Sequence, residues 1–239
     1  MEKNTTIVIL VVALIALGAY MFVSLQSNLD NVVSVTGTAE IKAEPELLAI
    51  YVSIETLENS AQLSKDKNAQ ISDNVITALV KLGLDRKEIQ TQDFNIYEEF
   101  DWSSNKRNSI GWKARNTLVI KTENFEKAGE IVDAAIDNGG LVQNINFEIT
   151  KETQNEIQAQ ALKEAAEDAQ NKAEALAQGS GGKLGKLVSL NSQDAGYYPY
   201  PVYSYAEGMG VKDARQAATD ISPKDLVITA SVQATYKIR

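Results

Sequence analysis

Apolar and polar residues alternate along the first part of the chain after residue 32. Apolar or small side chains stand at every second position over residues 33–41, and the same period returns over residues 48–54. A period of two is typical of β-strands that bury one face. Because only Glu44-Pro45-Glu46 separates the two stretches, we expect them to pair as an antiparallel hairpin.

Three later stretches have the spacing of amphipathic helices. The first begins at a cap on Asn59 or Ser60 and ends at Gly83, and the second covers residues 124–137. The third is the longest, from residue 150 or 151 to 178, and a Gly-rich run ends it. The apolar faces expected for the first and third helices are Ile71, Val75, Ala78, Leu79 and Leu82, and Ile157, Ala161, Ala165, Ala169, Ala173 and Leu176.

The remaining strands are expected at residues 91–102 and 110–122, which form a second hairpin, and at 145–149, 183–191 and 224–237. The element order is then ββαββαβαββ. Hairpins outnumber strand-helix-strand crossovers in this order, so it indicates an α+β fold, with a largely antiparallel sheet and helices packed on it.

The N-terminus carries twenty-one uncharged residues, 5–25, which as a helix would match the thickness of a bilayer's hydrocarbon core. We expect a short N-terminus and a single transmembrane anchor within residues 1–25, with the span itself at 5–25, then a linker over 26–31 and one extracytoplasmic domain over 32–239. Lys3 precedes the span and no Lys or Arg follows it before Lys42, which predicts a cytoplasmic N-terminus. A cleaved signal peptide and a buried soluble helix are the alternatives.

Composition removes several classes of function. The net charge of −9 disfavours a nucleic-acid partner, because such binding depends on Lys and Arg at phosphates. Since the chain has no His and no Cys, it cannot form a Ser-His-Asp triad, a Cys nucleophile, or a zinc or haem site that uses these ligands. We expect no cofactor, no metal and no catalytic residues. The acidic group Glu98, Glu99 and Asp101 is better explained as a solvated hairpin end, and Asp168 and Lys172 as a surface ion pair.

Several spaced motifs resemble one known family. They are Val33-x-Val35-x-Gly37-x-Ala39-x-Ile41-x-Ala43-x-Pro45, Ile89-Gln90-Thr91-x-x-Phe94, Gly111-Trp112-x-Ala114-x-Asn116-x-Leu118, the run AAEDAQNKAEAL over residues 165–176, Gly182-Lys183-Leu184-Gly185, and the strand 223–236. In this order they make the domain expected over residues 32–239 similar to the SIMPL-domain family, also known as oxidative-stress defence or periplasmic immunogenic proteins. The resemblance implies an envelope or secreted α+β domain linked to stress resistance, with a tendency to self-associate and no established catalytic residues.

One segment between the last two strands is a candidate interaction surface, because five of the nine tyrosines lie within nine residues and two prolines favour an extended backbone. A variable loop of no functional meaning is the alternative. The tyrosines are Tyr197, Tyr198, Tyr200, Tyr203 and Tyr205.

Three functional hypotheses follow. The favoured one is a membrane-anchored, non-enzymatic protein that forms a homo-oligomer or binds an envelope partner. The second is a module that binds a small molecule or glycan near Trp102, Trp112 or the tyrosines. The third is a hydrolase that uses carboxylates or a Ser-Lys pair. The sequence identifies neither a partner nor a ligand.

Overall fold

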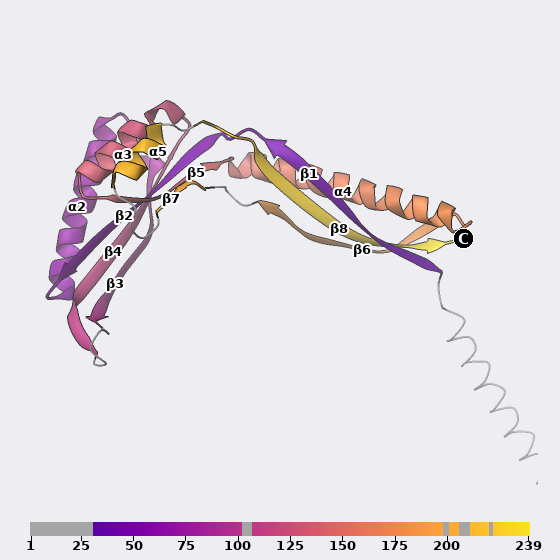
Figure 1. Ribbon diagram of the computed structural model, residues 1–239, viewed down its shortest axis with the longest axis horizontal. Helices are drawn as coiled ribbons and strands as arrows, with labels where there is room; N and C mark the ends of the chain where they lie inside the picture. Colours follow the sequence, from indigo (N-terminus) through magenta and orange to yellow (C-terminus); the bar gives the residue numbers. More distant parts are fainter. Residues whose placement is uncertain (1–30, 102–106, 198–200, 206–210, 220–221) are drawn as a thin grey trace, which may run out of the picture. The chain divides into compact units, whose positions relative to one another are not determined.

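The computed structural model describes residues 31–101, 107–197, 201–205, 211–219 and 222–239 (Figure 1). They form two compact units, each with its own sheet. The first unit comprises residues up to 39, 159–195 and 229–239, and the second comprises 40–158 and 196–228. The predicted α+β class with antiparallel pairing is confirmed, but two separate sheets replace the single sheet that we expected.

The first unit contains a three-stranded sheet in the order β1-β8-β6 and one long helix (Figure 1). The three strands are β1 (Val32–Ala43), β8 (Leu226–Ile238) and β6 (Leu184–Tyr197). The helix is α4 (Lys151–Gly179). Five alanines along α4 are buried, at intervals of four residues. They are Ala161, Ala165, Ala169, Ala173 and Ala177.

The alanine stripe meets β1 at a glycine. A Cβ atom added to Gly37 would lie only 2.0 Å from the carbonyl oxygen of Ala165, so the two backbones are in direct contact. Only small side chains fit such a contact. Leu176, which the periodicity placed in the stripe, is instead 55% exposed, and Ala177 takes the buried position.

The second unit contains a five-stranded sheet in the order β3-β4-β2-β5-β7, with helices packed on it (Figure 1). The strands are β2 (Leu47–Glu58), β3 (Ile89–Asp101), β4 (Asn108–Thr122), β5 (Leu141–Glu148) and β7 (Pro201–Ser204). The helices are α2 (Ala61–Lys81), α3 (Ala128–Asp137) and α5 (Val211–Thr219), with 3-10 turns at Arg86–Glu88 and Phe125–Lys127. Strand β7 and helix α5 lie in the Tyr-rich and Gly-rich stretch where we expected no regular element.

One expected hairpin is confirmed and the other is wrong. β3 pairs with β4 antiparallel along its length, as predicted. β1 and β2, however, belong to different sheets: β1 lies beside β8, whereas β2 pairs with β4 and β5. Pro45 favours an extended conformation at Glu44, so the connection does not supply the tight reversal that a hairpin needs.

Helix α2 packs on the sheet through polar as well as apolar residues. Ser60 is its N-cap, as expected, and Val75 and Leu79 are buried. The N-terminal half of the same face is polar, and hydropathy therefore did not reveal it. Its buried residues are Ser64, Asn68 and Ser72, which replace the expected Ile71 and Ala78, both only half-buried.

The Ser64 hydroxyl accepts a hydrogen bond from the Ala114 N–H and donates one to the Thr56 carbonyl, two residues directly opposite each other on β4 and β2. Asn68 donates to the carbonyls of Ile54 and Ala114. Helix and sheet are therefore fixed together by directional bonds, not by apolar contact alone.

The predicted anchor, residues 5–25, lies outside the described residues. Within the described part of the chain, every helix is too short or too polar to cross a bilayer. The transmembrane segment stays a prediction from the sequence.

Candidate functional site

The two edges of the three-stranded sheet differ in how they are covered. On β1, Asp168 of α4 accepts a hydrogen bond of 2.8 Å from the Thr38 N–H, and Lys172 donates one of 3.2 Å to the Thr36 carbonyl. Since the N–H and C=O of alternate strand residues point to the same side, these groups form the outer edge of β1. The edge groups of Thr36 and Thr38 are thus already occupied.

The same two side chains form an ion pair of 2.6 Å. The Lys172 ammonium and then the Thr38 N–H hold the pKa of Asp168 below its usual range. The sequence predicted this i,i+4 pair, but it could not show that the pair covers the edge of a strand. Natural proteins use charged groups in this way to prevent further strands from adding to a sheet.

The outer edge of β6 has no such cover among the described residues. All residues from 186 to 192 are exposed, and this run includes three large apolar side chains. Leu187, Val188 and Leu190 are exposed by 49%, 51% and 50%. A long, exposed strand with apolar side chains at a sheet edge is a template for pairing with another polypeptide. We call residues 186–192 the β6 edge.

The predicted Tyr-rich surface is only partly described, because Tyr198 and Tyr200 lie outside the described residues. Tyr203 is buried, with 7% exposure, and burial followed by the charge of Asp213 raises its pKa. Tyr197 is half-buried and its phenolic oxygen accepts a hydrogen bond from the Ile149 N–H. Tyr205, at 41% exposure, is the most exposed of the described tyrosines in this segment.

A buried carboxylate connects three strands on the five-stranded sheet. Glu148 accepts hydrogen bonds from the Tyr51 hydroxyl at 3.1 Å and from the Lys121 ammonium at 2.6 Å. Burial, together with the Glu148 charge, raises the pKa of Tyr51 to about 12. The phenol therefore stays protonated at neutral pH and acts as a fixed donor. Both carboxylate oxygens of Glu148 accept a hydrogen bond, so this carboxylate is better suited to a structural role than to proton transfer.

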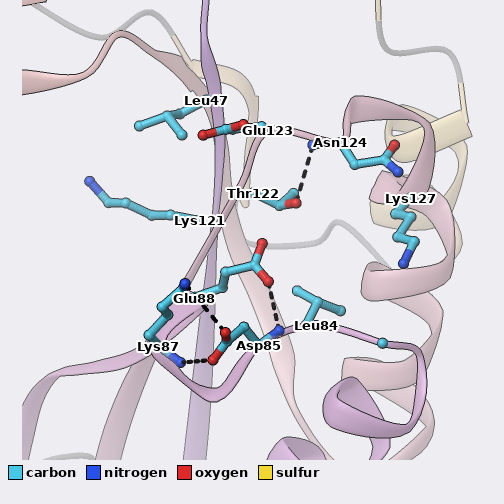
Figure 2. A pocket seen from close by; sticks show the side chains of 11 residues that line it. Leu47, Leu84, Asp85, Lys87, Glu88, Lys121, Thr122, Glu123, Asn124 and Lys127 are labelled. Atoms are coloured by element: carbon cyan, nitrogen blue, oxygen red, sulfur yellow. Dashed lines mark hydrogen bonds and ion pairs between the residues drawn. The ribbon is translucent and has the colours of Figure 1, made fainter.

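An open depression of about 430 Å³ lies near the C-terminus of α2 (Figure 2). Three lysines and three carboxylates line it, namely Lys87, Lys121, Lys127, Asp85, Glu88 and Glu123. Most of these charges are already used: Glu88 and Asp85 form a capping box, Lys127 donates to the Leu82 carbonyl, and Lys121 donates to Glu148. The balance of charge indicates no preference for an anion or a cation.

One member of the acidic group at the end of the β3–β4 hairpin, Glu99, forms an ion pair across the hairpin. Glu99 lies 3.2 Å from the Lys113 ammonium, which is also 3.8 Å from Glu55. Within the described ranges, no three acidic residues are grouped closely enough to hold a metal ion. Trp102 lies outside the described residues, and Trp112 is half-buried on β4.

A family model described as SIMPL, Protein of unknown function (DUF541), matches residues 33–236. This chain belongs to the SIMPL family. The match confirms the resemblance drawn from the motifs. It spans both units, so the SIMPL region includes the closed edge of β1 and the open edge of β6.

Two relatives of this SIMPL chain align over most of their length. The 26 kDa periplasmic immunogenic protein of Brucella melitensis biotype 1 is 22% identical over 175 residues, which cover 71% of this chain and 70% of the relative. The YggE protein of Escherichia coli K12 is 23% identical over 199 residues, which cover 83% and 77%. Identities at this level support a shared fold more strongly than shared details of a surface.

Proposed function

We propose that this chain is a non-enzymatic protein of the cell envelope. Residues 5–25 anchor it as a single-pass span with a cytoplasmic N-terminus, and the SIMPL domain works outside the cytoplasm. Two observations support this location: the uncharged stretch is long enough for a bilayer, and one relative carries the word periplasmic in its name.

The domain acts through contact with protein, either a second copy or another envelope protein. The observation that carries this proposal is the β6 edge, where a half-exposed Leu, Val and Leu lie on a strand that pairs with β8 on one side only. Exposed strand edges of this kind are costly for a protein to keep, since they promote aggregation. A contact that uses the edge explains why β1 is covered while β6 is not.

The test uses the full chain in its own membranes. Fractionation should recover it with the membrane and not with the soluble fraction. Protease added to the outer side should remove the domain. Sedimentation of the detergent-solubilised protein should then give a mass above that of one 26.1 kDa chain plus detergent. A soluble, full-length monomer would reject both the location and the mode of action.

The depression near the C-terminus of α2 supports a second candidate function, the binding of a small zwitterionic molecule, because cationic and anionic side chains line it together. Replacement of Lys127 by Met removes one of its charges. Loss of thermal stabilisation by such a ligand in this variant, but not in wild type, would favour this candidate over assembly.

A further inference from the structure

We propose that the β6 edge pairs antiparallel with the β6 edge of a second copy of this chain, so that two three-stranded sheets become one continuous sheet. This inference rests on the proposed function, because it assigns the copy-to-copy contact to one strand. Three features of the first unit support it: the direction of the free backbone groups, the pattern of side chains, and the closure of the opposite edge.

The backbone pattern fixes which residues of β6 can bind a further strand. Lys183 and Arg239 exchange both of their backbone hydrogen bonds, at 2.7 and 2.9 Å, so they form a hydrogen-bonded pair of an antiparallel ladder. Counting along β6 by twos, odd-numbered residues direct their N–H and C=O groups to β8. Even-numbered residues, including Val188 and Leu190, direct theirs to the open edge.

The side chains of the β6 edge are self-complementary. Leu184 packs against the buried cluster formed by β1, β8 and α4, so even-numbered side chains lie on the α4 side of the sheet. In an antiparallel pair centred on Ser189, Val188 of each copy stands opposite Leu190 of the other. Two apolar cross-strand pairs then form, and Lys186 stands opposite Ser192 and meets no like charge.

The β6 edge also lacks the features that block strand addition. Residues 184–190 contain one charged residue, Lys186, and no proline. Gly185 lies close against β8, where an added Cβ would be 2.7 Å from the Lys237 carbonyl oxygen, so the backbones of β6 and β8 approach closely at this end of the strand. At the opposite edge of the sheet, Asp168 and Lys172 bond the backbone groups of Thr38 and Thr36 on β1. Growth of the sheet is therefore directed to β6.

The absence of cysteine from the chain permits a direct test by disulfide formation. Ser189→Cys puts a thiol at the centre of the expected pair, where two opposing residues do not share hydrogen bonds and their Cα atoms approach to about 4.5 Å, within the range of a disulfide. Asn191→Cys is the matched control, because it is exposed on the same face of the same strand. In the expected register Asn191 stands opposite Leu187 of the other copy. The Asn191 residues of the two copies are therefore offset by four residues along the strands, about 13 Å, which is too far for a disulfide.

Full-length variants are oxidised in their own membranes and analysed on non-reducing gels. We expect at least about fivefold more disulfide dimer from Ser189→Cys than from Asn191→Cys, because only the first has allowed disulfide geometry. Adding Leu190→Lys should lower the Ser189→Cys dimer by a similar factor. Adding Leu176→Lys should not, since Leu176 is equally exposed but lies on α4.

Four other results would each reject the pairing of two β6 edges. Equal cross-linking at both positions would indicate random collision and would overturn the β6 pairing. An oligomer by sedimentation without a Ser189→Cys dimer would overturn the pairing but leave the proposed function in place. A disulfide-linked product with another protein, without the homodimer, would reject a second copy as the occupant. A monomer in every assay would reject both proposals.

Discussion

Replacement of Gly37 by alanine tests the packing on which the first unit depends. A Cβ atom at this position would lie 2.0 Å from the Ala165 carbonyl oxygen, 2.4 Å from the Ala169 nitrogen and 2.7 Å from the Ala169 Cβ. Ordinary contact begins at 3.4 Å. The three atoms belong to the helix backbone or to a Cβ bonded to it, so no side-chain rotation relieves the overlap. The helix and the strand must separate by 1.4 Å, the difference between 3.4 and 2.0 Å.

Such a shift affects the whole alanine stripe. Overpacking of a core typically costs about 1–3 kcal/mol, and more when the backbone must move. A gap of 0.5–1 Å already removes about a quarter to a half of the dispersion attraction between two surfaces. We therefore expect Gly37→Ala to lower the free energy of unfolding of the first unit by about 3 kcal/mol or more.

Urea unfolding of the full chain measures this effect. Circular dichroism at 222 nm follows α4 together with the other helices, while fluorescence follows the two tryptophans of the chain, Trp102 and Trp112, of which Trp112 lies in the second unit. Gly129→Ala is the control, because its Cβ would have no atom within 4 Å. It lies in α3, where alanine should stabilise by up to about 1 kcal/mol. If Gly37→Ala changes stability by less than about 0.5 kcal/mol, the inferred backbone contact is wrong.

Three further predictions concern the second unit. Because the pKa of Tyr51 is raised to about 12, unfolding releases a proton between about pH 10 and 12, so stability should fall as pH rises through this window. Tyr51→Phe should remove that part of the decline in a pH series of urea denaturations, and an unchanged decline would contradict the assignment. Bonds from the Thr150 N–H and then the Thr153 hydroxyl lower the pKa of Glu46, so their stabilisation should be lost as pH falls through that lowered value. In thermal unfolding over a series of pH values, Glu46→Gln should cost about 1 kcal/mol at pH 7 and progressively less as the pH falls through the lowered pKa of Glu46; a cost that stays constant over the series would count against a charge-assisted bond to the Thr150 N–H. Asn68→Ala should cost about 2–4 kcal/mol, because the buried carbonyls of Ile54 and Ala114 lose their donor. A chemical denaturation curve that overlays the wild-type curve would contradict a stabilising role for these two hydrogen bonds.

The strongest local patterns of the sequence predicted the right elements. The period of two in β8 and the long β3–β4 hairpin appear as expected, because alternation directly encodes which face of a strand is buried. A glycine within a strand is typical of a close backbone approach or a bulge. Gly37 touches the α4 backbone, and Gly111 has a φ of +135° where the β3–β4 register shifts.

The sequence was less informative wherever a polar group has a partner distant in the chain. Ser64 and Asn68 contribute nothing to the hydrophobic pattern of the helix, and their buried positions depend on strand partners 8 to 50 residues away, Thr56, Ile54 and Ala114. Strand β7 and helix α5 were missed for a related reason. Their segments are short, so pairing with β5 and packing on α3 decide their structure more than local propensity does.

The sequence by itself determined the SIMPL family, the α+β class and the chemistry that the chain lacks, since motifs, periodicity and composition are local properties that need no partner. Tertiary structure decided which strands share a sheet, which edge is covered and which is open. Those features depend on backbone hydrogen bonds, and every residue other than proline offers the same backbone N–H and C=O groups. The ion pair of Asp168 and Lys172 shows the difference. Its i,i+4 spacing can be recognised from the helical sequence alone, but its hydrogen bonds to the backbone of Thr36 and Thr38 form only because α4 packs against β1.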